Sequence, residues 1–250
     1  MKYISIFFIF FVGISCAQIN QVDAKGLKQG LWYKNFPGTK IHMYEGTFKD
    51  DKPVGIFTYR YESGSVKAIV NNKQNSKLAF VKMYFENEAI MSEGSYYDQK
   101  KDSVWINFNE RGELVSAESY IDDKLNGKKI IYYLNEQLEA GKMNVLSITN
   151  YVNDLKEGAY KEFHPSGKLK STGNYVKGER FGEWVDYYNT GQVMTRVRYH
   201  RDLLYGWAYY YDKNGSQLSK TMWRDGFKLE GKDLEMFLKR CKDKNLDPNQ

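Results

Sequence analysis

Hydrophobic and polar positions follow a phrase of about 24 residues that returns along this chain. Each copy starts with Gly, has a Trp or Tyr two positions later and a Tyr or Phe five positions later. A turn Gly follows nine positions after the first, and then Leu or Val and a late Tyr. The clearest copies start at Gly158 and Gly182, and the next at Gly206. A fixed period of this length predicts a repeat architecture, and about eight units are present where about three give a stable array.

The residue types inside each unit predict strands. Stretches such as 184–188 and 207–211 are rich in aromatic residues, which fit the pleated surface of a sheet. Short polar segments that end in Gly, such as 62–64, interrupt them and suit hairpin loops with a residue at positive φ. Turns such as 50–53 and 122–126 join one hairpin to the next. Because a lone hairpin is marginal in water, the hairpins must pack side by side.

The spacing of the two aromatic positions predicts rings on both faces of the sheet. The positions lie three residues apart, and on a regular strand an odd separation places side chains on opposite faces. We therefore expect an all-β fold, an elongated single-layer twisted antiparallel sheet of tandem hairpins with some aromatic surface exposed. Packing on neighbouring repeats is the default role of any one ring. The rings considered as a binding surface are Trp105, Phe108, Trp184, Tyr187, Tyr188, Trp207 and Tyr211.

The copy from Gly182 to Val193 spells Gly-x-Trp-x-x-Tyr-Tyr-x-x-Gly-x-Val. It resembles MORN-type repeats, and in particular the bacterial variant found in the YwqK-like antitoxin family. The resemblance covers about residues 26–228. It implies an extended hairpin sheet that binds proteins or membranes, with no catalytic residues to transfer. The antitoxin label is kept as a further alternative for function.

Several units depart from the pattern. Ser103 replaces the first Gly, Arg60 stands where an aromatic is expected, and Lys129 replaces the Trp. The step from Gly127 to Gly158 is 31 residues instead of 24. We expect these units to be distorted, and the longer one to bend the array around residues 144–149.

The first 17 residues lie outside the repeat and predict export. An apolar run over residues 4–12 follows Lys2 and precedes small residues, which is typical of a signal peptide. The run is shorter than the about 20 apolar residues of a membrane span. Two processing routes stay open. Cys16 resembles the acylated Cys of a lipoprotein box, which would give a membrane-anchored lipoprotein, while cleavage after Ala17 would give a soluble periplasmic or secreted protein.

The C-terminal residues predict one helix. Leu234, Phe237, Leu238 and Cys241 follow the i, i+3, i+4, i+7 spacing within 232–242. The helix should cap the last hairpin, with Cys241 as a buried small hydrophobe and a polar, frayed tail after it. The expected organisation is signal peptide 1–17, linker 18–25, repeats 26–228, and capping helix with tail 229–250. Once Cys16 is acylated or removed, Cys241 has no partner for an internal disulfide.

Composition and charge favour an ordered binding protein over an enzyme. Aromatic residues make up 16% of the chain, more ring area than disordered chains contain. The net charge of +6 comes from mixed charges, which favours a solvated surface over nucleic-acid binding. His42, His164 and His200 are scattered, and the acid pairs 50–51 and 122–123 are expected to be solvated turn residues. We predict no catalytic residue, no metal site and no cofactor.

Two classes of function therefore remain. The first is a cell-envelope scaffold that binds another protein, or the membrane surface, through exposed aromatic rows. The alternative is a cell-wall carbohydrate or choline-type binder, in which rings trap quaternary ammonium groups by cation–π attraction. Those repeats are nearer 20 residues and start with Gly-Trp, and Gly206-Trp207 is the one such pair in this chain.

Overall fold

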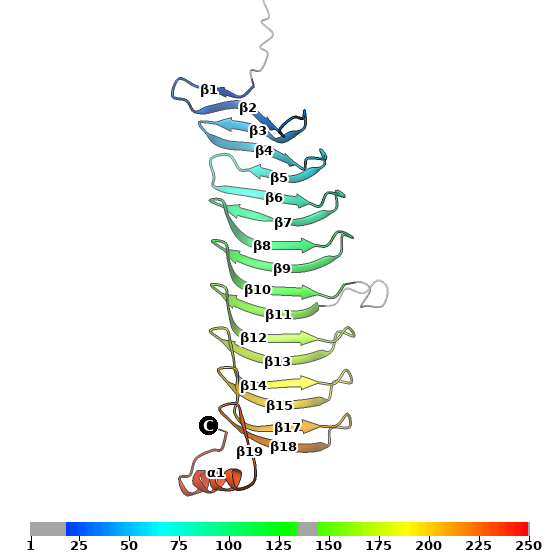
Figure 1. Cartoon of the computed structure of the whole chain (residues 1–250), viewed down its shortest axis with the longest axis vertical. Helices are drawn as coiled ribbons and strands as arrows, with labels where there is room; N and C mark the ends of the chain where they lie inside the picture. The colour runs from blue at the N-terminus through cyan, green and yellow to red at the C-terminus, as the bar shows by residue number, and fades with distance from the viewer. Residues whose placement is uncertain (1–18, 135–144, 250) are drawn as a thin grey trace, which may run out of the picture.

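A computed structural model describes residues 19–134 and 145–249 of the chain. These residues form one open antiparallel sheet in a single layer, as the repeat predicts (Figure 1). The strands pair in sequence order, so the sheet grows hairpin by hairpin along its long axis. The exception is that β16 and β17 both pair with β15. The strands are β1 (Gln21–Val22), β2 (Lys28–Asn35), β3 (His42–Lys49), β4 (Lys52–Arg60), β5 (Val66–Asn72), β6 (Leu78–Tyr84), β7 (Ile90–Tyr97), β8 (Lys100–Phe108), β9 (Leu114–Ile121), β10 (Lys124–Tyr132), β11 (Val145–Val152), β12 (Leu155–Phe163), β13 (Leu169–Val176), β14 (Glu179–Tyr187), β15 (Val193–His200), β16 (Leu203–Leu204), β17 (Gly206–Tyr211), β18 (Gln217–Arg224) and β19 (Phe227–Leu229).

The wide loops within hairpins lie along one long edge of the sheet, which we call the loop edge (Figure 1). Their glycines have positive φ as predicted, for example 96° at Gly64 and 102° at Gly191. Side chains also join several of these loops to the next unit. The Tyr61 and Tyr188 hydroxyls each donate a hydrogen bond of 2.8 Å to a main-chain oxygen one unit ahead. His164 stands at the same repeat position, and its Nε2 lies 2.9 Å from the main-chain oxygen of Tyr187, so this His extends the row of cross-unit bonds.

Tight turns between hairpins lie along the opposite edge, the turn edge. They are shorter than expected, because Lys52 and Lys124 already belong to β4 and β10. Asp50 and Asp51 have φ of 51° and 61°, as in two-residue type I′ turns. The Asp51 carboxylate accepts the Lys28 main-chain N–H at 2.8 Å. The Asp123 carboxylate does the same for Lys101 at 2.6 Å, so these acids fasten each turn to the preceding hairpin.

The longest unit does not bend the sheet. Strand β11 pairs with β10 on one side and β12 on the other, so the sheet continues through this unit (Figure 1). The additional residues fall in the connection between β10 and β11, whose residues 135–144, including Asn144, lie outside the described part of the chain. Ser103 takes the backbone conformation of the Gly that it replaces, with φ of 63°. Neither departure from the pattern interrupts the array.

The C-terminal end is capped as predicted. Helix α1 (Gly231–Asp243) follows β19, and Cys241 on it is 5% exposed. The tail after α1 is docked and not frayed, because Asn249 Oδ1 accepts the Trp207 main-chain N–H at 3.1 Å. In the described residues no helix is long and apolar enough to cross a bilayer.

At the other end, Gln21 and Val22 of the expected linker form β1. The predicted signal peptide and the predicted lipid attachment at Cys16 lie outside the described residues.

Candidate binding surface

The two faces of the sheet differ in how well their side chains are covered. We call the face that holds Trp105 and Trp184 the ring face, and the face that holds Ile56, Phe80 and Val104 the open face. Trp105 is 0% exposed and Trp184 8%. Ile56 is 62% exposed, Phe80 47% and Val104 52%. The core of this single-layer sheet therefore lies on the ring face.

Glycines on the strands that precede the ring-bearing strands, namely β3, β7 and β13, make room for the rings. The backbone positions of Gly46, Gly94 and Gly173 lie directly against Phe57, Trp105 and Trp184, and no Cβ fits at any of the three. Tyr160, Tyr175 and Tyr199 surround Trp184, with ring centroids 5.1 to 6.1 Å away. The aromatic pattern of the sequence thus becomes a packed row of rings.

The chain supplies its own cations to this row. The Lys101 Nζ lies 4.5 Å from the Trp105 ring centroid, and the Arg180 guanidinium lies 3.9 Å from the centroid of Tyr199. Lys156 lies 4.7 Å over Tyr175. These are the distances of cation–π contacts. A quaternary ammonium ligand would have to displace Lys or Arg from these rings, which counts against choline-type binding at the ring face.

The unit in which Lys129 replaces the Trp is compensated within the row. Lys129 Nζ pairs with Glu118 at 2.9 Å, and the Tyr120 hydroxyl donates to the same carboxylate at 2.7 Å. Burial raises the pKa of Glu118, but the hydrogen bonds from Tyr120 and Lys129 outweigh it and leave the pKa below its usual value. Glu118 stands opposite Trp105 on β9. An ion pair thus fills a position that a Gly and an aromatic occupy elsewhere. The strand pairing of this unit is kept, and the expected distortion is limited to its first Gly, Gly127, whose φ is 112°.

The structure divides the expected binding residues into three groups. Trp105 and Trp184 are core residues of the ring face, in the packing role that is the default for any one ring, and neither offers a surface to a partner. Tyr188 lies in the loop-edge row of cross-unit bonds. Strand alternation places four half-buried residues on the open face, namely Phe108, Tyr187, Trp207 and Tyr211. Trp207 differs from Trp184 because it follows the unit's first Gly by one residue instead of two, which turns it to the other face.

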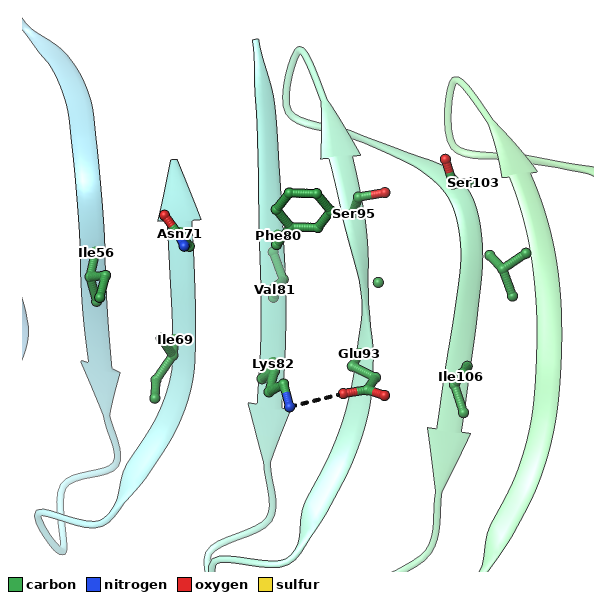
Figure 2. A pocket seen from close by; sticks show the side chains of 12 residues that line it. Ile56, Ile69, Asn71, Phe80, Val81, Lys82, Glu93, Ser95, Ser103 and Ile106 are labelled. Atoms are coloured by element: carbon green, nitrogen blue, oxygen red, sulfur yellow. Dashed lines mark ion pairs between the residues drawn. The ribbon is translucent and has the colours of Figure 1, made fainter. Parts of the chain in front are cut away.

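A shallow hollow lies in the open face over β4 to β8 (Figure 2). It measures about 670 Å³ and is lined mainly by the apolar side chains of Ile56, Ile69, Phe80, Val104 and Ile106. On their strands these residues come next to core residues: Ile56 precedes Phe57, and Val104 and Ile106 flank Trp105. Apolar residues directly beside a core ring are the sequence signal that could have predicted this hollow.

Polar groups stand beside the apolar lining. Lys82 Nζ pairs with Glu93 at 3.3 Å, and Asn71, Ser95 and Ser103 complete the rim (Figure 2). An apolar hollow with a few polar groups can hold apolar side chains of a partner and fix their orientation. Within residues 19–134 and 145–249, no three His, Cys, Asp or Glu side chains gather as metal ligands do.

One unit of the chain matches a known family. Residues 156–177, which run from the start of β12 to the turn after β13, match the model described as MORN repeat variant. No curated protein matches the chain significantly. The matched unit and the sheet of tandem hairpins of the same design together support a MORN-type repeat protein.

Proposed function

We propose that this chain is a non-catalytic repeat scaffold that binds another protein through the open face. The observation that carries the proposal is the exposed apolar hollow between β4 and β8. Contiguous exposed apolar surface of this kind is typical of interaction sites. The ring face offers less exposed apolar surface to a partner, because its rings are packed against glycines and covered by the chain's own Lys and Arg.

Site-specific photo-cross-linking tests this proposal. A photo-reactive residue placed at Phe80 in the full chain should cross-link to one defined protein in the cells that produce it. The matched control is Met236 on α1, which is 63% exposed and apolar but lies away from the hollow. Equal cross-linking from both positions, or none from position 80, would reject the open face as the binding surface.

The cross-linked protein then allows a quantitative measurement. Phe80→Ala should weaken its binding to the purified scaffold, because burying a Phe side chain contributes about 1.5–3 kcal/mol, or roughly tenfold to a hundredfold in Kd. Met236→Ala should leave the Kd unchanged. An antitoxin-like role is one form of this binding, and the identity of the cross-linked protein decides whether it applies.

A further inference from the structure

A straight row of open-face side chains crosses the strands, each opposite the next in the pairing register. We call it the middle row. From β8 to β11 it consists of Ile106, Ala117, Ile130 and Ile148. From β12 to β18 it consists of Lys161, Thr172, Val185, Arg196, Tyr209 and Lys220. The row is thus apolar beside the hollow and basic towards the C-terminal end.

The cations of the basic half lack close carboxylates. In the N-terminal half, Lys82 is paired with Glu93. Among the described residues, neither Lys161 nor Lys220 has a carboxylate within ion-pair distance, and the nearest to Arg196 is Glu183 at 3.9 Å. All three cations are exposed. Arg196 is thus only loosely paired, and Lys220 Nζ lies 4.3 Å over the Trp207 ring instead of beside an acid. Cations with so little negative charge near them favour a partner that brings carboxylates.

The spacing of the row suits an extended chain lying across the strands. Neighbouring strands are about 4.8 Å apart, so Lys161 and Arg196, three strands apart, are separated by roughly 14 Å. Arg196 and Lys220, two strands apart, are separated by roughly 10 Å. An extended polypeptide advances about 3.3 Å per residue. Side chains at alternate positions of an extended chain face the same way and repeat about every 6.6 Å. Carboxylates at such positions can therefore meet successive cations within the reach of the long Lys and Arg side chains.

We infer that the open face binds an acidic polypeptide segment along the middle row. Its carboxylates lie opposite Lys161, Arg196 and Lys220, and its apolar side chains lie on Ile148 to Ile106 and enter the hollow. This inference rests on the proposed function and names the chemistry of its partner. It predicts a segment that is acidic at one end and apolar at the other.

Other occupants fit the row less well. A nucleic acid has phosphates along its whole length and would leave them over the apolar half. An anionic bilayer pressed against the face would likewise place its phosphates over the apolar half of the row as well as over its cations. A second copy of the chain brings an identical basic half, so pairing of the two C-terminal halves is opposed by like charges.

The test measures binding of a fluorescent peptide of about 16 residues, with Leu in one half and Glu in the other, to the full chain. The triple variant Lys161→Glu, Arg196→Glu, Lys220→Glu should lose about tenfold or more in affinity, because attraction becomes repulsion. The matched control, Lys25→Glu, Lys40→Glu, Lys213→Glu, changes three exposed lysines elsewhere by the same charge. The peptide affinity of this control should stay within about twofold of the unaltered chain, since distant surface charges are screened by salt. Circular dichroism confirms that both variants fold.

Three results would overturn the inference. One is equal loss in both triple variants. Another is that oligothymidine, or vesicles of phosphatidylcholine and phosphatidylglycerol, bind more tightly than the peptide and that the triple row variant abolishes this binding. The third is self-association in sedimentation that the row variant abolishes. Cross-linking from position 80 is measured separately, so a partner that cross-links there while the peptide fails rejects the acidic preference and leaves the scaffold function standing.

Discussion

Single residues in this sheet are constrained by backbone conformation as much as by packing. Ser103 has φ of 63°, close to the 65° of Gly55 and the 75° of Gly182 at the same repeat position. A residue with a Cβ is strained in this left-handed region by roughly 1–2 kcal/mol, and Gly is not. Ser103 is therefore a place where the chain has accepted strain that its other units avoid.

Replacing Ser103 by Gly should stabilise the protein. The gain is about 0.5–1 kcal/mol, because relief of the strain is partly offset by the greater freedom of Gly in the unfolded chain. The urea midpoint measured by circular dichroism should rise. The reciprocal change Gly182→Ser should lower it by a similar amount, and a Ser103→Gly protein less stable than the parent would show that the side chain contributes more than its strain costs.

Neighbouring strands are matched to each other by paired positions 11 residues apart. Gly94 faces Trp105, and the equivalent pair one unit earlier is Val70 and Val81, which stand opposite each other. The two valine side chains thus fill the space that the Trp105 ring fills alone opposite Gly94. Further pairs at this spacing are Thr149 with Tyr160, Val197 with Ala208, and Glu118 with Lys129. What the elements preserve is the combined volume or charge of the pair.

A double-mutant cycle at one pair tests this matching. Gly94→Val alone should destabilise the protein by about 1–3 kcal/mol, because the added side chain overlaps the Trp105 ring. Trp105→Val alone should destabilise it by about 3 kcal/mol through the cavity that it leaves. The double variant should be more stable than the sum of the two effects predicts, by about 1 kcal/mol or more. Additive free energies of unfolding would show that the pair is not coupled.

The sequence predicts the elements better than the binding surface. The 24-residue period, the turn glycines and the apolar spacing within α1 are local signals. The hairpins and the burial of Cys241 on the helix can therefore be predicted from them. Strand alternation also predicts that Trp184 and Tyr187 face opposite ways. It cannot say which face is covered, because the close fit of Gly94 against Trp105 comes from the neighbouring strand β7. For that reason the sequence names Trp105 as a candidate binding residue and does not single out Phe80.

At the scale of the whole molecule, the sheet is a stack in which strands contact mainly their sequence neighbours. Stability of such arrays is approximately a sum over units and the interfaces between them. Both edges follow the same rule, because turn carboxylates and loop-edge tyrosines reach one unit and no further. The fold therefore depends on each unit being correctly aligned with the next one more than on the number of units.

Deleting one whole unit should leave a folded, shorter array. Removing residues 158–181 joins Glu157 to Gly182, which has the repeat position of Gly158. We expect the β-sheet signal in circular dichroism, cooperative unfolding and a lower m-value, since less surface is exposed on unfolding. As a control, removing residues 158–169 takes out half a unit and reverses the direction of every later strand. Unfolding of the whole-unit deletion would contradict a nearest-neighbour array.

The pairing of strands along the long axis also determines the response of the molecule to tension. Force applied through the two ends acts along the direction of the inter-strand hydrogen bonds, so it opens them one after another and does not shear whole strands at once (Figure 1). Each hairpin that detaches releases about 24 residues, or roughly 80 Å of extended chain. Held between two attachment points, the protein would lengthen in steps of about this size, with one longer step for the 31-residue unit that starts at Gly127. It would act as an extensible linker and not as a rigid rod.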